Sequence, residues 1–323
     1  EFCYYEFNCY IGDTLKLDSL SEWGVEKFNA IIANPPYQKR NKNGIGKHGK
    51  SNLWTKFINK SFKMLEENGL LLYVTPNSWM NGTVNCYKNM INKQFHYINV
   101  NECKKHFKGI GSTFSYYLIE NRPIYKETKV KCEYNKKTFD ECSIQLNDKM
   151  KILPQLLIPE TISIMNKVCN WDTSGKFVRK DLIKNKDKLN KVKELDYIHP
   201  VITFVKKDGS LDIQYCKDKL CTQDYKKVML FRSGYLNPIY DNGENGVGDN
   251  IHYAKVDSEE EGKYLLELYK SKLYRFIFAI CKTSQYTGGT LMNWLYHKFS
   301  GYVIVYKQFK INSRERKIIN ANL

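Results

Sequence analysis

The sequence predicts an α/β fold in which short buried strands alternate with helices around a mainly parallel sheet. Two short apolar runs, residues 7–12 and 28–33, predict buried strands. From Leu53 to Leu65 the apolar residues recur at helical spacing, and residues 70–76 form the next apolar run. The order strand, strand, helix, strand is typical of a parallel sheet that helices cover on both faces.

Two further strands and a helix end complete this first part of the prediction. Asn68 and Gly69 predict the end of the helix, because both residue types tolerate the left-handed backbone of a helix stop. Residues 95–102 and 112–120 predict two strands joined by a basic bend that contains glycine. We expect these two strands to form an antiparallel pair at the edge of the sheet.

The character of the sequence changes after Arg122, where lysine-rich alternating stretches begin. We therefore expect two domains, residues 1–150 and 151–323. Inside the second domain, apolar residues from Tyr264 to Ile280 trace one face of a helix.

The chain is strongly basic, with 51 Lys and Arg against 34 Asp and Glu and a formal net charge of +17. Neutralising the phosphates of a polyanion releases counterions, so nucleic acid is the expected partner. A genome rich in A and T would also produce a chain rich in lysine and asparagine, and this alternative stays open.

The cysteines and the hydropathy of the sequence indicate the cellular compartment of the protein. The 10 cysteines are scattered, with no ligand-spaced Cys/His cluster, so we expect reduced thiols and no metal site. The longest apolar runs are far too short to span a membrane, and the first residues lack a signal-peptide layout. We expect an intracellular, cytoplasmic protein.

A rigid corner, Asn34-Pro35-Pro36-Tyr37, follows directly after the second apolar run. Proline fixes φ and lacks an N–H donor, and it pushes the preceding residue out of the helical region. The tetrapeptide therefore continues neither a strand nor a helix. It predicts a stiff, exposed loop at the end of a strand.

An Asn-Pro-Pro-Tyr corner in this position resembles the catalytic motif of amino-methyltransferases that use S-adenosylmethionine. The resemblance is to the N6-adenine DNA methyltransferases of the Eco57I and TaqI type, the gamma-type family. Residues 11–15, 53–80 and 106–120 also resemble segments of that family in order and spacing. The family implies a Rossmann-like class I methyltransferase sheet, incomplete here at its N-terminal side, followed by a C-terminal α+β target-recognition domain.

The resemblance also implies a function and a set of site residues. The function is that of a site-specific DNA methyltransferase, which transfers a methyl group from S-adenosylmethionine to the N6 amine of a flipped adenine within a restriction-modification system. Asp13 and Thr14 would contact the cofactor, and Tyr37 and Phe107 would hold the two faces of the flipped base. The catalytic residues would be Asn34, Pro35, Pro36 and Tyr37.

The chemistry of the tetrapeptide supports this reading independently. The lone pair of an adenine N6 amine is delocalised into the ring, so the amine is a poor nucleophile. Two acceptors aimed at its hydrogens, the Asn34 side-chain oxygen and the Pro35 carbonyl, would favour a pyramidal nitrogen through positioning and electrostatics, with no general base. Tyr37 offers a flat face for a base turned out of the duplex.

The segment after the corner is basic and admits two readings. Residues 44–51 satisfy the pattern of a phosphate-binding loop, but no apolar strand precedes them, so nucleotide hydrolysis is disfavoured. The two interpretations that stay open are a mobile basic flap that approaches nucleic-acid phosphate and a plain solvated loop. Tyr286 and Trp294 are further candidates for DNA contact. The principal DNA-binding candidates are Lys39, Arg40, Lys47, Lys50 and Arg232.

The family's glycine-rich cofactor turn has no counterpart before residue 11. We expect double-stranded DNA as the substrate, and an upstream polypeptide or a partner subunit to complete the cofactor pocket. Three alternatives stay open: a non-catalytic or partner-dependent DNA-specificity subunit, an RNA methyltransferase, and a methyltransferase acting on protein glutamine. The sequence contains no convincing nuclease constellation.

Overall fold

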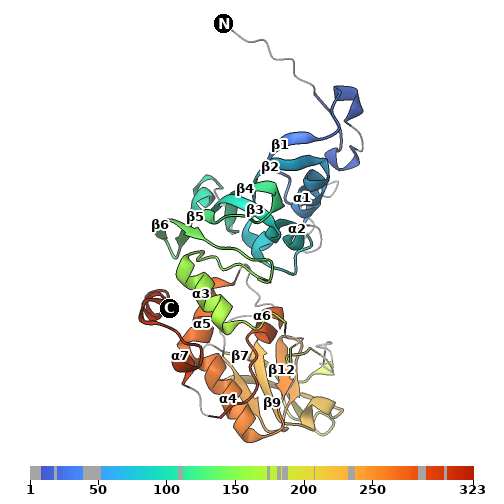
Figure 1. Ribbon diagram of the computed structural model, residues 1–323. Coiled ribbons are helices and arrows are strands. Elements are labelled where there is room, and N and C mark those ends of the chain that lie inside the picture. The colour runs from blue at the N-terminus through green and yellow to red at the C-terminus, as the bar shows by residue number, and fades with distance from the viewer. Residues whose placement is uncertain are drawn as a thin grey trace. The chain divides into compact units, whose positions relative to one another are not determined.

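The computed structural model divides the chain into two compact units, Glu1–Pro159 and Glu160–Leu323 (Figure 1). The division falls a few residues after the boundary expected at residue 150. Each unit has its own core and is described by itself. The structure describes residues 9–17, 20–38, 52–107, 112–172, 175–179, 183, 188–206, 208–231, 237–282, 289–301 and 304–323.

Unit 1 is built on a six-stranded mixed sheet in the order β1-β2-β4-β3-β5-β6 (Figure 1). The pairs β1/β2 and β3/β5 are parallel, whereas β4 runs antiparallel to both of its neighbours. The carboxyl ends of β1, β2, β3 and β5 therefore lie at one edge of the sheet. The strands are β1 (Phe28–Ala33), β2 (Leu65–Pro76), β3 (Lys93–Val100), β4 (Phe114–Pro123), β5 (Thr128–Tyr134) and β6 (Lys137–Ile144).

The predicted antiparallel pair exists, but its predicted place at the sheet edge is wrong. Strands β3 and β4 pair as expected, and β4 lies between β2 and β3 in the interior of the sheet. The hairpin of β5 and β6 extends the sheet beyond β3. Its alternating, lysine-rich sequence resembles a change of domain, which is why the sequence analysis ended the sheet too early.

The predicted helix is present as α1 (Leu53–Met64), and it buries Trp54, Thr55, Ile58 and Ser61. It ends before the predicted stop, because Leu65 already has extended backbone and begins β2. Asn68 does adopt a left-handed backbone with φ 63°, but it does so inside the residues of β2.

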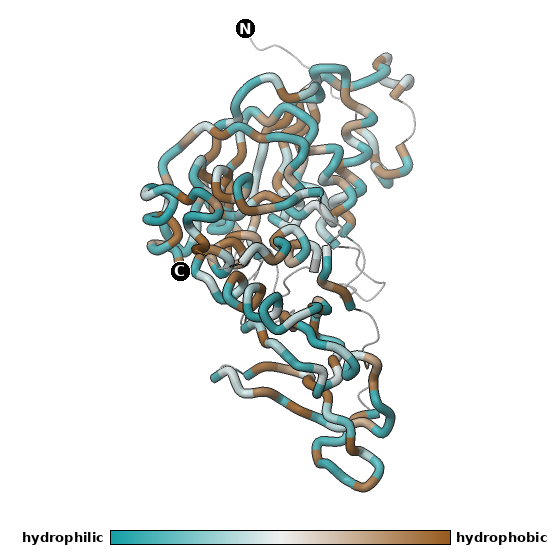
Figure 2. The backbone as a smooth tube through the Cα atoms, turned by 60° about the horizontal axis from the view of Figure 1, so that its bottom comes forward, coloured by the Kyte–Doolittle hydropathy of each residue, from teal (hydrophilic) through white to brown (hydrophobic). Residues whose placement is uncertain are grey.

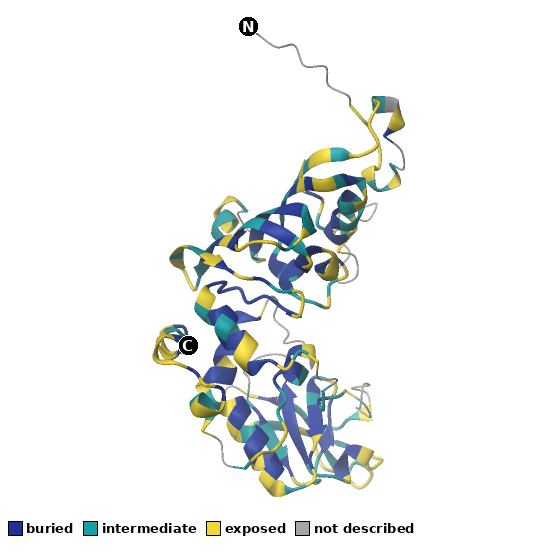
Figure 3. Cartoon of the chain, in the orientation of Figure 1, coloured by how far each residue is buried: buried dark blue, intermediate teal, exposed yellow. Residues whose placement is uncertain are grey.

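The two apolar runs at the N-terminal side were predicted to be buried strands, and the structure corrects both. Residues 28–33 form β1, yet none of the six is buried, and the side chain of Ile32 is 76% exposed (Figure 3). Residues 9–12 form no strand and are exposed. Among the described residues, β1 pairs with β2 alone, so its second edge has no neighbour.

The core of unit 1 is an aromatic cluster beneath the centre of the sheet. Trp79 stacks on Phe95 with ring centroids 5.6 Å apart and meets Tyr117 at 5.0 Å. The Trp79 indole N–H donates to the Ser115 hydroxyl at 2.6 Å, so its one polar atom is satisfied in the interior. This packing fixes β2, β3 and β4 relative to one another and thereby positions their ends.

Unit 2 contains two three-stranded sheets, β10-β9-β12 and β11-β7-β8, with helices around them (Figure 1). Buried residues of both sheets, among them Ile202, Met229 and Tyr253, form one hydrophobic cluster. The strands are β7 (His199–Val205), β8 (Leu211–Cys216), β9 (Lys227–Phe231), β10 (Ile239–Asp241), β11 (Gly246–Val247) and β12 (Ile251–Lys255). The helices of the chain not yet given are α2 (Tyr87–Ile91) in unit 1, and α3 (Pro159–Val168), α4 (Glu259–Lys270), α5 (Lys272–Ile280), α6 (Gly289–Trp294), α7 (Val305–Gln308) and α8 (Ser313–Ala321).

The helical face predicted from Tyr264 to Ile280 is buried as expected, but two helices carry it. Ser271 separates α4 from α5 with an extended backbone, ψ 150°. Its hydroxyl accepts from the Tyr274 N–H and donates to the Leu268 carbonyl, so one side chain serves the end of α4 and the start of α5.

Hydrophobic stretches along the backbone are short and alternate with hydrophilic ones (Figure 2). In the part of the chain that the structure describes, no helix has the length and apolar character needed to cross a bilayer. The nine described cysteines are free thiols, and no group of three or more His, Cys, Asp or Glu side chains among the described residues is arranged to hold a metal ion.

Candidate active site

The proline corner lies at the carboxyl edge of the sheet, directly after β1. Ala33 is the last residue of β1 and pairs with Tyr73 of β2. After it, the side chain of Asn34 is exposed, Pro35 is buried, Pro36 is exposed and Tyr37 is half-buried. The buried proline anchors the corner, and the exposed asparagine is available to a ligand at the edge where open α/β sheets bind their ligands.

The described residues on the two sides of the basic segment lie next to each other at this corner. The Tyr37 carbonyl accepts from the Leu53 N–H at 3.2 Å, and Gln38 forms an antiparallel bridge with Asn52. The residues that flank the basic segment, Gln38 and Asn52, are therefore neighbours at the candidate site. Residues 39–51 lie outside the described residues, and with them the proposed flap lysines, Arg40 and the phosphate-loop pattern.

Tyr37 closes the corner through its hydroxyl group. The hydroxyl donates to the Asn34 side-chain oxygen at 2.6 Å and lies 3.5 Å from the Val74 carbonyl. Burial raises the pKa of Tyr37 to about 12, with a smaller contribution from the nearby Cys103. The hydroxyl therefore stays protonated at neutral pH and remains a donor. An amide oxygen has two lone pairs, so Asn34 can accept a second hydrogen bond while it keeps that of Tyr37.

Three aromatic rings stand together beside the corner. Phe107 stacks on Phe114 with centroids 4.2 Å apart and an interplanar angle of 11°. Tyr37 lies 5.3 Å from Phe114 and 6.4 Å from Phe107, tilted against both. The structure thus brings the two predicted base-stacking residues into one cluster. It adds the buried Phe114, which the sequence analysis missed because a phenylalanine inside a strand pattern gives no signal beyond core packing.

The acidic residue predicted to meet the cofactor lies in an exposed turn before β1. One Asp13 oxygen accepts from the Leu15 N–H at 3.1 Å and caps a short 3₁₀ helix, Thr14–Lys16. Asp13 and Thr14 are both exposed, and the neighbouring Ile11 is 93% exposed. A carboxylate beside an uncovered apolar side chain fits the amino group and ring of an adenosine, so these residues can form one wall of a cofactor pocket.

Of the remaining candidates for DNA contact, two cannot be placed and one is buried. Arg232 and Tyr286 lie outside the described residues. Trp294 is only 7% exposed and packs edge-to-face on Trp171 at 5.5 Å, so the expectation that it contacts DNA is wrong. Its apolar ring belongs to the core of unit 2.

Residues 10–107 match the family model described as Eco57I restriction-modification methylase. The matched segment contains the proline corner, α1, β2, β3 and Phe107. Unit 1 therefore contains a segment that is similar to the Eco57I restriction-modification methylase family. A comparison with curated proteins found no match.

Three solved structures of restriction-modification enzymes align with this chain to different extents. The Type IIL enzyme MmeI in complex with DNA aligns with a TM-score of 0.50 at 10% identity, over 82% of this chain and 46% of MmeI. A nuclease-deletion mutant of the Type ISP enzyme LlaGI aligns at 0.44 and 10% identity, over 94% of this chain and 42% of that one. The M protein of the Type I enzyme EcoKI aligns at 0.27 and 16% identity, over 37% of this chain and 27% of that one. The chain spans about half the length of MmeI, and the likeness to MmeI shows an α/β fold of the same kind.

Proposed function

We propose that the chain is the catalytic and target-recognition part of a site-specific DNA methyltransferase, which transfers a methyl group from S-adenosylmethionine to the N6 amine of a flipped adenine. The observation that carries the proposal is the exposed Asn34 at the carboxyl end of β1, inside a segment that matches the methylase family. Asn34 is hydrogen-bonded to Tyr37, whose ring lies 6.4 Å from that of Phe107. The setting would be a restriction-modification system in the cytoplasm.

The chain's own groups would orient the amine. The Asn34 side-chain oxygen and the Pro35 carbonyl accept the two N6 hydrogens, so the nitrogen turns pyramidal and its lone pair points out of the base plane. S-adenosylmethionine, when bound, supplies an electrophilic methyl group. The two prolines fix the direction of the acceptors, and Tyr37 holds the Asn34 amide in place through its 2.6 Å hydrogen bond.

The flipped base would lie against the aromatic cluster. Tyr37 and Phe107 are its stacking partners, and the buried Phe114 supports Phe107 from behind. Base stacking on aromatic rings contributes about 1–3 kcal/mol per base in single-strand binding proteins, enough to offset much of the unstacking from the duplex.

The cofactor pocket is completed from outside the described residues. Asp13 and Thr14 hold one side of the adenosine. An upstream polypeptide or a partner subunit adds its strands beside the free edge of β1 and brings the opposite wall. The exposed Ile32 and the unpaired edge support this view, because an apolar strand gains both hydrogen bonds and burial from a neighbour.

Unit 2 would read double-stranded DNA. The chain's net charge of +17 supports a polyanionic substrate. Methyl transfer to a glutamine side chain of a protein would not need a second unit of this size, whereas reading a DNA sequence would. The DNA-contact roles of Lys39, Arg40, Lys47, Lys50 and Arg232 belong to this proposal.

Methyl transfer to adenine-containing duplex DNA tests the proposal. The chain is assayed alone and together with the polypeptide encoded upstream, as unmodified protein, as Asn34→Ala and as the matched control Asn29→Ala, which alters an exposed asparagine within β1. Asn34→Ala should abolish transfer while DNA binding persists, and Asn29→Ala should leave both unchanged. Transfer that survives Asn34→Ala contradicts the assignment.

A DNA-specificity subunit without catalysis is the second candidate, favoured by the open edge of β1. It predicts sequence-specific DNA binding with no transfer even after the upstream polypeptide is supplied. Transfer to RNA or to a glutamine-containing peptide in the same assay, with none to duplex DNA, would redirect the substrate class.

A further inference from the structure

We infer that Asn101 is a positioning residue, which sets the place of Phe107 and so controls how the site grips the flipped base. The inference rests on the proposed function. It concerns residues 101–107, the described segment of the β3–β4 loop that follows β3, and it follows from the backbone, the side-chain links and the unpaired atoms around Asn101.

Asn101 adopts a left-handed backbone, φ 72° and ψ −21°, directly after the last residue of β3. Its N–H donates to the Phe114 carbonyl at 2.8 Å, and its carbonyl accepts from the Lys104 N–H at 3.0 Å. The residue thus turns the chain out of the sheet and starts the 3₁₀ helix Glu102–His106. Asparagine is among the few residues besides glycine that tolerate this conformation.

The Asn101 side chain ties three strand ends together. Its oxygen accepts from the Asn77 amide at 2.6 Å, and its own amide donates to the Glu133 carbonyl at 2.8 Å. Asn77 follows the last residue of β2 and is 1% exposed, while Glu133 lies near the end of β5. The loop that carries Phe107 is therefore fixed to the same carboxyl edge that carries Asn34.

A second link holds the next residue of the loop. The Asn99 amide donates to the Glu102 carboxylate at 2.6 Å, and Lys131 lies 3.5 Å from the other Glu102 oxygen. The hydrogen bond from Asn99 holds the pKa of Glu102 below its ordinary value, so the link is present at neutral pH.

The loop closes on the aromatic cluster. The Phe107 N–H donates to the Lys104 carbonyl at 2.9 Å, and its ring stacks on Phe114, the residue whose carbonyl accepts the Asn101 N–H. Phe114 thus contacts both ends of the segment 101–107. A displacement of the Asn101 backbone would therefore move the ring of Phe107, whose centroid lies 6.4 Å from that of the Tyr37 ring.

The arrangement is costly, which points to a role beyond stability. The side-chain oxygens of Asn77 and Asn99 are buried and have no hydrogen-bond partner among the described residues. Unpaired buried acceptors and a left-handed non-glycine residue both oppose folding. Their concentration at the carboxyl edge, beside the candidate site, fits a geometry kept for binding.

The first test measures how often the loop opens, and it needs no substrate. Cys103 lies inside the loop and is partly buried, so its alkylation rate, followed by peptide mass spectrometry, reports loop opening. Asn101→Gly keeps the left-handed backbone but removes both side-chain links, and should speed Cys103 alkylation about tenfold, a factor that corresponds to about 1.4 kcal/mol. Cys132, which is buried, and Cys221, which is exposed, are the internal references.

The matched control is Asn135→Gly. Asn135 also has a left-handed backbone, φ 49°, but it is exposed in the turn between β5 and β6. This variant should leave the Cys103 rate unchanged. Equal Cys103 rates in Asn101→Gly and the unmodified chain would overturn the inference, whether or not the protein transfers methyl groups.

The second test is a double-mutant cycle on kcat/KM for duplex DNA. If Asn101 acts through Phe107, Asn101→Gly should lower kcat/KM about tenfold in the unmodified protein and have little further effect in Phe107→Ala. Additive losses would mean that Asn101 is only structural and would contradict the inference. Absence of transfer in every form, including the unmodified one, would instead refute the proposed function and leave the alkylation rates to decide on Asn101.

Discussion

Strands β1 and β9 show how little the composition of a strand decides its burial. The β1 sequence, FNAIIA, has five apolar residues out of six, yet none of them is buried. The β9 sequence, KVMLF, begins with lysine, and all five of its residues are buried (Figure 3). The difference lies in the neighbours, because β9 pairs on both sides whereas β1 has one described partner. An apolar strand that is paired on one side only can therefore stay exposed.

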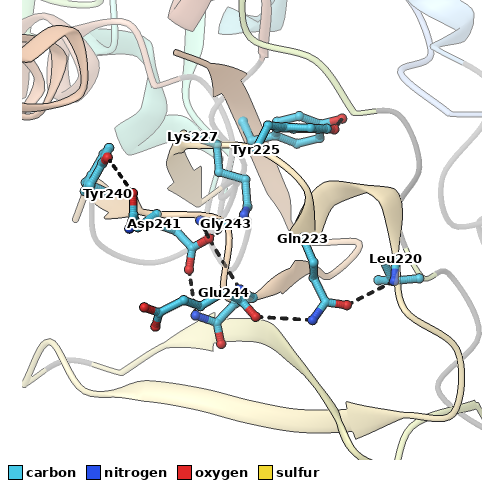
Figure 4. A network of polar contacts seen from close by, with 11 residues as sticks. Leu220, Gln223, Tyr225, Lys227, Tyr240, Asp241, Gly243 and Glu244 are labelled. Atoms are coloured by element: carbon cyan, nitrogen blue, oxygen red, sulfur yellow. Dashed lines mark hydrogen bonds and ion pairs between the residues drawn. The ribbon is translucent and has the colours of Figure 1, made fainter. Parts of the chain in front are cut away.

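The buried lysine of β9 is stabilised by a polar network at the end of β10 (Figure 4). Lys227 donates to the Asp241 carboxylate, which also accepts from the Gly243 N–H at 3.0 Å and the Asn245 side chain at 2.6 Å. The Gln223 amide donates to the Glu244 carbonyl at 3.2 Å and fixes the same turn. The carboxylate therefore makes burial of the lysine possible.

The largest expected effect comes from breaking this network. Asp241→Asn should lower the free energy of unfolding of unit 2 by about 3–5 kcal/mol, because it leaves the buried Lys227 ammonium without a counter-charge. Urea denaturation measures the loss. The double variant Lys227→Met/Asp241→Asn should recover most of it, and a single-variant loss below about 1 kcal/mol would show that the pair is not needed.

The next largest effect compares core truncations in the two strands directly. Met229→Ala in β9 should cost about 2–5 kcal/mol, since this side chain is fully buried. Ile32→Ala in β1 should cost less than about 0.5 kcal/mol in the chain alone. Similar losses at both positions, measured in the same denaturation experiment, would mean that β1 is already covered in solution.

A partner changes the prediction for β1. Burial of Ile32 against an added strand should contribute about 1.5–3 kcal/mol to association, so Ile32→Asp should weaken binding of the upstream polypeptide about 10- to 150-fold. Analytical ultracentrifugation of the mixed polypeptides measures the change. Asn29→Asp, an exposed site on the same strand, is the control and should have little effect.

The smallest expected effect is the dependence of stability on pH that comes from the Tyr37 hydroxyl. Its pKa is raised to about 12, so the stability that its buried hydroxyl contributes is present below about pH 10 and is lost as the pH rises through about 12. Ultraviolet absorbance follows the ionisation of tyrosines as the pH is raised, and the part of the change that Tyr37→Phe removes is the ionisation of Tyr37. This part should occur at a higher pH than the ionisation of exposed tyrosines. Titration of that signal near pH 10 would show that Tyr37 is exposed and does not hold Asn34.

The sequence predicted the features that depend on local chemistry. The proline corner, α1 and the pairing of β3 with β4 all follow from residue types at fixed spacing. It could not predict features set by distant partners. The interior place of β4 depends on its insertion between β2 and β3, and the exposure of Ile32 depends on β1 having a single partner among the described strands.

The candidate site shows the same division. The corner at Asn34 and the aromatic Phe107 were readable, because rigid prolines and a familiar spacing mark them. The supporting Phe114 and the amide links of Asn101 were not readable, since a buried ring and an asparagine after a strand resemble ordinary core and turn residues until the strand ends are placed together.

The central claim is that a further polypeptide pairs with β1 and completes the cofactor pocket. Its most direct test is calorimetric titration of S-adenosylmethionine into this chain, alone and after addition of the polypeptide encoded upstream. We predict no measurable heat of binding for the chain alone and saturable binding for the completed protein. Tight binding by the chain alone would contradict the account, because the pocket would then need nothing beyond the residues of this chain.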